Sequence, residues 1–111
     1  MGQGNPPPVD NLTVEDIKAG LSSGSILLVD VREQNEWDIV SIPGAVLIPK
    51  NEFLIGDALT RLPQDKPVVL HCKSGGRSAE VLAVVKGAGF SDAVHVGGGV
   101  LAWVSQIEPD K

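Results

Sequence analysis

One short segment of the chain combines a nucleophile with features that would make it reactive. Cys72, the only cysteine, is followed by Lys73, Ser74, Gly75, Gly76, Arg77 and Ser78. The two glycines allow successive N–H groups to turn toward one centre, and a helix predicted to begin here adds partial positive charge. Lys73 and Arg77 add full charges. Because all of these features stabilise a thiolate, we expect a lowered pKa and a reactive sulfur at Cys72.

A second interpretation of Cys72 is structural. A lone cysteine after a run of Val and Leu is typical of a small buried hydrophobic residue. The glycines, the two cations and the position between a strand and a helix favour the reactive interpretation instead. His71 adjoins the cysteine, but neighbouring strand residues point to opposite faces of a sheet. We therefore expect His71 to be a packed histidine rather than a catalytic base, and Ser78 to cap or orient the loop.

The residue inventory restricts the chemistry further. A single cysteine excludes an internal disulfide or CxxC pair, so a disulfide cycle would need an outside thiol. Two histidines and one cysteine argue against a Cys/His zinc site, and no metal or cofactor is predicted. N–H donors and cations around a thiolate suit a nucleophile that accepts a group from an anionic donor. Sulfane sulfur, phosphate and arsenate are the candidate groups.

Short apolar strands alternate with helical segments along the chain. Strands are predicted at 25–31, 45–48, 68–71 and 93–96, and helices at 13–23, 33–40, 51–62, 77–86 and 98–107. This alternation predicts an α/β domain with a mainly parallel sheet flanked by helices. Cys72 then lies at the carboxyl end of a strand, where open α/β sheets bind their ligands.

Length and composition limit the organisation and the partners. The 111 residues suit one domain, and we assign residues 1–11 to a Pro-rich tail or linker, 12–108 to the domain and 109–111 to a C-terminal tail. A net charge of -5 argues against nucleic-acid binding. The chain contains neither a signal peptide nor an apolar run of about 20 residues, so we expect a cytoplasmic protein that does not bind membranes.

Four ordered motifs make the chain similar to a rhodanese-type sulfurtransferase domain over roughly residues 12–107. They are Asp30-Val31-Arg32-Glu33, Ile42-Pro43-Gly44-Ala45, the loop Cys72 to Ser78 in the form C-x-x-G-x-R-S, and Gly98-Gly99 with Trp103. The strings IPGAVLIPKNEFL, LPQDKPVVLHCKSGGRSAE and AGFSDAVHVGGGVLAW resemble more closely the C-terminal rhodanese domain of adenylyltransferase/sulfurtransferases of the MoeZ/MoeB type. One departure is Ser41, where the family often has histidine.

The resemblance implies a three-layer α/β/α fold and a persulfide mechanism. Cys72 would take sulfane sulfur from a small anionic donor such as thiosulfate, or from a persulfide, and pass it to a thiophilic acceptor. That acceptor is cyanide in the test tube, and the resemblance suggests a ubiquitin-like sulfur carrier or an adenylyltransferase domain as partner. Lys73 and Arg77 would hold the donor, and Asp30 and Arg32 would brace the loop by hydrogen bonds. A weak surface ion pair is the alternative for Asp30 and Arg32.

Two other functions stay open at this point. A phosphatase or arsenate reductase of the same fold places one more residue between cysteine and arginine than the four found here, Lys73 to Gly76. The shorter loop favours a single sulfur atom over a tetrahedral oxyanion. The second alternative is a non-catalytic module that docks a partner, and the presence of Cys72 argues against it.

Overall fold

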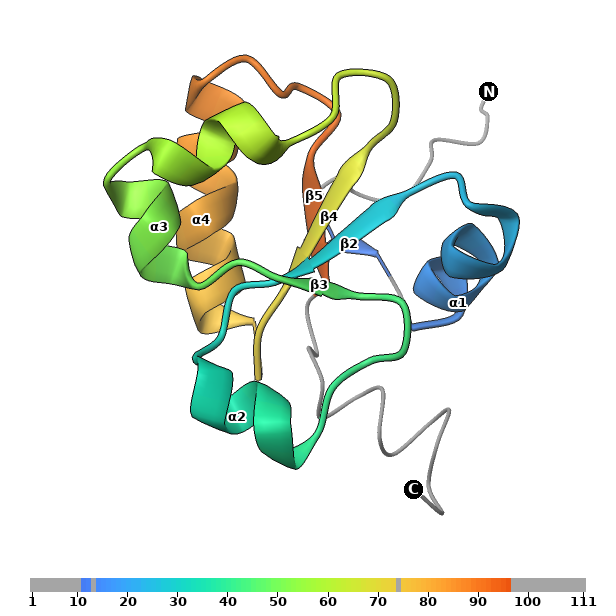
Figure 1. Cartoon of the computed structure of the whole chain (residues 1–111). Coiled ribbons are helices and arrows are strands. Elements are labelled where there is room, and N and C mark those ends of the chain that lie inside the picture. The colour runs from blue at the N-terminus through green and yellow to red at the C-terminus, as the bar shows by residue number, and fades with distance from the viewer. Residues whose placement is uncertain (1–10, 13, 74, 97–111) are drawn as a thin grey trace.

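Strands and helices alternate along the chain in the computed structural model, which describes residues 11–12, 14–73 and 75–96 (Figure 1). The elements in order are β1 (Asn11–Leu12), α1 (Val14–Ser23), β2 (Leu27–Asp30), α2 (Gln34–Ile39), β3 (Val46–Leu47), α3 (Lys50–Leu54), the 3-10 helix η1 (Asp57–Arg61), β4 (Val68–His71), α4 (Gly76–Gly87) and β5 (Val94–Val96).

The strands form one sheet in the order β1-β5-β4-β2-β3, and every pairing between them is parallel. Asp30 is in register with His71 at the carboxyl ends of β2 and β4, and Leu70 is in register with His95 of β5. The predicted α/β class and parallel sheet are confirmed. Parallel pairing brings the carboxyl ends of these strands to one edge, and Cys72 follows directly after β4 there.

Helices cover both faces of the sheet, which gives the three layers that were expected (Figure 1). Helices α3 and α4 lie on one face and α1 on the other, while α2 lies beyond the carboxyl ends of the strands. One core cluster, beneath α3, η1 and α4, is formed by Val29, Val31, Ile48, Phe53, Ala58, Leu62, Val68, Leu70, Cys72, Val81, Leu82, Val85 and Ala93. A second cluster, beneath α1, is formed by Ile17, Leu28, Ile42, Val69, Val94 and Val96.

The element boundaries differ from the sequence prediction in two places. The segment 51–62, predicted as one helix, is divided because Gly56 adopts a φ of +85°, a left-handed conformation that ends α3 before η1 begins. Strand β1 was not predicted, and it begins at Asn11, which the sequence assigns to the tail. The predicted helix 98–107 lies outside the described residues. No helix among the described residues is both long and apolar enough to span a bilayer.

Candidate active site

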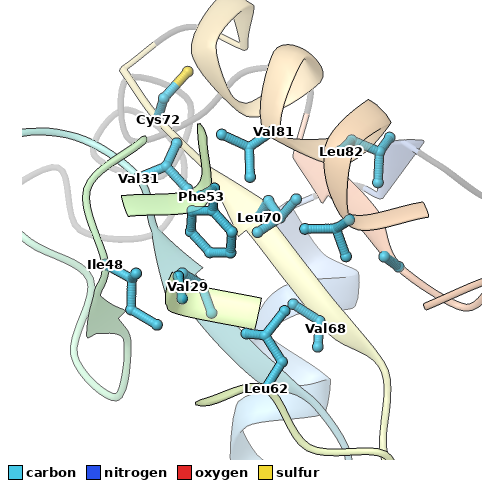
Figure 2. Packing of buried hydrophobic residues seen from close by; sticks show 13 residues of the cluster. Val29, Val31, Ile48, Phe53, Leu62, Val68, Leu70, Cys72, Val81 and Leu82 are labelled. Atoms are coloured by element: carbon cyan, nitrogen blue, oxygen red, sulfur yellow. The ribbon is translucent and has the colours of Figure 1, made fainter. Parts of the chain in front are cut away.

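Cys72 is buried, with only 1% of its surface exposed, yet its sulfur has polar neighbours. The backbone N–H of Gly75 donates to Sγ at 3.1 Å, and that of Ser78 donates at 3.4 Å. Figure 2 shows Cys72 at the margin of the core cluster, its sulfur directed away from Phe53 and Leu70. The Cβ is therefore packed in hydrocarbon while the sulfur faces N–H donors. Contacts of this kind favour the thiolate form of a cysteine over the thiol.

The loop holds this geometry because one of its glycines is left-handed. Gly75 precedes α4 with a φ of +114°, a conformation that residues with a side chain rarely adopt. The buried Ser78 donates its hydroxyl to the carbonyl of Gly75 at 3.1 Å, which closes the turn. Ser78 therefore orients the loop, as predicted. Because α4 begins at Gly76, the positive end of its dipole lies beside Cys72.

Arg77 is engaged by an acid that the sequence analysis did not identify. Its Nη1 and Nη2 donate to Oε1 and Oε2 of Glu36 in α2, at 2.7 and 2.9 Å. The hydrogen bond from Arg77 lowers the pKa of Glu36 from 4.5 to about 2, although partial burial opposes this. Glu36 in turn raises the pKa of Arg77 through its hydrogen bond and its charge, although partial burial of the guanidinium opposes this. The guanidinium is therefore already paired with a carboxylate across the end of the sheet.

Two further residues of the predicted loop lie at the surface. Lys73 is exposed, and so is Gly76, the first residue of α4. Ser74 lies outside the described residues. The charge of Lys73 therefore lies at the surface of the loop, whereas the charge of Arg77 is compensated by Glu36.

Asp30 and Arg32 form a buried pair, so the alternative of a surface ion pair is wrong. They are 0% and 2% exposed. The Asp30 carboxylate accepts from the backbone N–H, Nε and Nη2 of Arg32 at 2.7–3.0 Å. Arg32 Nη2 also donates to the carbonyl of Val40, the residue that ends α2, at 2.6 Å. Among the described residues, this pair makes no hydrogen bond to the Cys72 loop.

The pair still contributes to the site through α2. Arg32 fixes the end of α2 at Val40, and the same helix carries Glu36, which holds Arg77. Asp30 and Arg32 are therefore linked to Arg77 through contacts with α2, and the predicted direct hydrogen bonds from the pair to the loop are absent among the described residues. No sequence signal linked Glu36 to Arg77, because 41 positions separate them.

His71 is fully buried. The side chains of His71 and Cys72 point to opposite faces of the sheet, as expected from strand geometry. Burial lowers the pKa of His71, and this effect is larger than the opposing effect of Asp30, whose Oδ2 lies 3.7 Å from Nε2. His71 is therefore a packed histidine, as predicted.

Glu80, the acid nearest in sequence, is exposed and pairs with Lys50 at 2.9 Å. His95 was overlooked by the sequence analysis, and its Nδ1 lies 3.0 Å from the Ser78 hydroxyl. Within the described part of the chain, there is no group of three or more His, Cys, Asp or Glu side chains that could hold a metal ion.

Known proteins are similar to this chain in both sequence and fold. The family model described as a rhodanese-like domain matches residues 13–106. The chain is 54% identical over 100 residues to the probable adenylyltransferase/sulfurtransferase MoeZ of Mycobacterium tuberculosis, which covers 89% of this chain and 26% of MoeZ. It is 35% identical over 78 residues to a sulfurtransferase of Allochromatium vinosum, covering 70% of this chain and 71% of that protein.

Solved structures agree with these sequence matches. A rhodanese-like domain protein from Staphylococcus aureus superposes with a TM-score of 0.75 at 35% identity, covering 85% of this chain and 90% of the other. The human single-domain sulfurtransferase TSTD1 superposes with a TM-score of 0.76 at 25% identity, covering 87% and 96%. The present chain spans about a quarter of the length of MoeZ. The motifs, the parallel sheet and these matches together place the chain in the rhodanese-like domain family, as a domain of the sulfurtransferase type.

Proposed function

We propose that the domain transfers sulfane sulfur through a persulfide on Cys72. The observation that carries this proposal is the environment of Sγ, which accepts from the Gly75 and Ser78 amides at the N-terminus of α4. N–H donors and a helix N-terminus favour the thiolate form of such a sulfur. The same N–H donors would stabilise the negative charge of a persulfide.

In the first step, the Cys72 thiolate attacks the outer sulfur of thiosulfate or of a persulfide donor. A bond forms between Sγ and that sulfur while the sulfur–sulfur bond of the donor breaks, and sulfite or the donor thiolate leaves with the electron pair. In the second step, an acceptor nucleophile attacks the terminal sulfur of the persulfide. The Cys72 thiolate leaves, which returns the enzyme to its starting state.

The charges around the loop bear on the choice of donor. Lys73 is exposed, but Arg77 is neutralised by Glu36. The loop thus provides less attraction for a small dianion than the sequence suggests, since the arginine has a bidentate partner. This arrangement suits protein persulfides of low charge at least as well as thiosulfate.

The similarity to MoeZ supports a proposal for the acceptor. MoeZ carries the name of an adenylyltransferase/sulfurtransferase. We therefore propose a small ubiquitin-like sulfur carrier, activated by an adenylyltransferase, as the protein that receives the sulfur. A pull-down with the reduced domain should capture a small protein ending in Gly-Gly, and the absence of such a protein would count against this acceptor.

The reaction is tested by supplying thiosulfate and cyanide and measuring thiocyanate. The wild-type chain should form thiocyanate, and Cys72→Ser should form none. An aryl phosphate assayed in parallel separates the phosphatase alternative. Phosphate release without thiocyanate would replace the proposal with that alternative, and neither product would favour a binding module.

A further inference from the structure

Three side chains, from the loop after β4, from α4 and from β5, form a row that starts at the Cys72 sulfur. The thiol of Cys72 lies 3.7 Å from the Ser78 hydroxyl oxygen, within reach of a long hydrogen bond to sulfur. That oxygen lies 3.0 Å from Nδ1 of His95. The carbonyl of Gly75, at 3.1 Å from the same oxygen, fixes the position of the hydroxyl. The Ser78 hydroxyl thus bridges a thiol and an imidazole.

The sheet register explains why His95 reaches this row. His95 of β5 is paired in register with Leu70 of β4, and Leu70 belongs to the core cluster beneath α4. Register partners in a parallel sheet point to the same face, so His95 faces α4 and Ser78. The imidazole is only partly buried, whereas Ser78 is fully buried. His95 can therefore exchange a proton with water while Ser78 cannot.

We propose that His95 is a positioning residue that acts through Ser78 to take up the proton of the Cys72 thiol. The hydroxyl proton of Ser78 first turns from the Gly75 carbonyl toward Nδ1 of His95. It then moves to that nitrogen as the thiol proton of Cys72 moves to the Ser78 oxygen. The products are a thiolate, an unchanged hydroxyl and an imidazolium, so that one proton is displaced and no electron is transferred. The inference deepens the proposed function, because the sulfur-transfer reaction depends on this thiolate.

The other charged groups near Ser78 are paired, exposed or on the opposite face of the sheet, so His95 is the candidate for taking up the thiol proton. Arg77 of α4 is paired with Glu36 of α2, and Glu80 of α4 is paired with Lys50 of α3. Lys73 is exposed at the end of β4. The remaining group at this end of β4, His71, lies on the opposite face with the buried Asp30–Arg32 pair. Among the described residues, His95 is the titratable base that contacts the hydroxyl next to Cys72.

The test measures the rate of Cys72 alkylation by iodoacetamide as a function of pH. His95→Asn places an amide near the position of Nδ1, so that it can hold the hydrogen bond to Ser78 but cannot take up a proton near neutral pH. His95→Ala removes both capacities, and Ser78→Ala removes the bridge. Ser91→Ala, at an exposed position outside the row, is the matched control. Circular dichroism of each variant shows whether it is folded.

We expect all three variants in the row to alkylate about tenfold more slowly near pH 6, which corresponds to one pKa unit of coupling. The double variant Ser78→Ala/His95→Asn should lose no more than either single variant, since both interrupt one relay. A wild-type pH profile in His95→Asn, or additive losses in the double variant, would overturn the inference. Persulfide formation by wild-type protein, measured separately, shows whether the proposed function itself holds.

Discussion

Removing the negative charge of Glu36 tests how the loop controls its own electrostatics. In Glu36→Gln the amide oxygen can still accept from Arg77, and from the backbone N–H of Glu33 that Glu36 caps at 3.0 Å. The contacts to Oε1 are kept, whereas the negative charge and the second hydrogen bond, from Arg77 Nη2 to Oε2, are lost. We expect the net charge of the pair to change from zero to +1, with Arg77 then free to attract an anion.

The pKa of Glu36 indicates how much stability is lost in Glu36→Gln. A pKa of Glu36 lowered from 4.5 to about 2 corresponds to about 3 kcal/mol. Because the two side chains are 30% and 25% exposed, solvent screening reduces this to about 1–2 kcal/mol. Folding lowers the pKa of this acid, so its contribution is complete above about pH 4.5 and is lost as the pH falls toward 2. Glu36→Gln should therefore have a lower free energy of unfolding than wild type at pH 7. Between pH 4.5 and 2, its free energy of unfolding should also depend less on pH than that of wild type.

The effect on the loop is measured with two alkylating agents of different charge. A unit charge at 4–8 Å in water contributes about 0.5–1 kcal/mol, which is about a two- to fivefold change in rate. We expect the ratio of Cys72 alkylation by iodoacetate to alkylation by iodoacetamide to rise by this factor in Glu36→Gln. Asp38→Asn, an exposed carboxylate on the same helix, is the control with the same change in net charge.

A rise of the ratio in Asp38→Asn as large as that in Glu36→Gln would contradict this role of the Glu36–Arg77 pair. That outcome would mean that the overall charge of the domain, and not the pairing of Arg77, determines how anions reach the sulfur. An unchanged ratio in Glu36→Gln would show that Arg77 does not act on the approaching reagent at all.

Three further predictions follow from other contacts. Gly75→Ala should lower the free energy of unfolding by about 1–3 kcal/mol, because the residue has a φ of +114°. It should also slow alkylation of Cys72, because the amide of residue 75 then moves away from the sulfur. Thermal unfolding and alkylation rates check this, and an unchanged alkylation rate would contradict it. Arg32→Met should destabilise the domain by about 3–5 kcal/mol in urea unfolding, since it leaves the buried Asp30 carboxylate unpaired. Adding Asp30→Asn should recover part of this stability. The absence of any recovery would count against the loss of the ion pair as the cause. With a net charge of -5, thiosulfate turnover should rise about two- to threefold with ionic strength, whereas a steep fall would mean that local attraction dominates.

The sequence was sufficient to predict the fold and the position of Cys72 at the end of a strand. The run of apolar residues in 68–71 indicates a buried strand up to His71, and the glycines after Cys72 indicate a turn. Together these two features place the Cys72 sulfur at the end of a strand. These are local features. Gly56 was misjudged because a glycine within a helix-compatible segment is tolerated in some helices and ends others. Two-residue strands such as β1 carry too little pattern to be recognised.

The partners of the loop could not be predicted because they come from distant parts of the chain. Glu36 meets Arg77 only once α2 is fixed beyond the end of the sheet, and His95 meets Ser78 only through the register of β5 with β4. Burial of Asp30 and Arg32 was similarly hidden, since charged residues near a strand end are more often exposed. Contacts of this kind depend on three-dimensional packing that spacing along the chain does not report.

The central claim is that Cys72 carries a transferable sulfur atom, and mass spectrometry of the intact protein measures this directly. After exposure to thiosulfate, the wild-type chain should gain the mass of one sulfur atom, and cyanide should remove it with release of thiocyanate. Cys72→Ser should gain nothing under the same conditions. A wild-type chain that stays at its original mass while iodoacetamide still alkylates Cys72 would contradict the claim, because the sulfur would then be reactive and yet not accept sulfur.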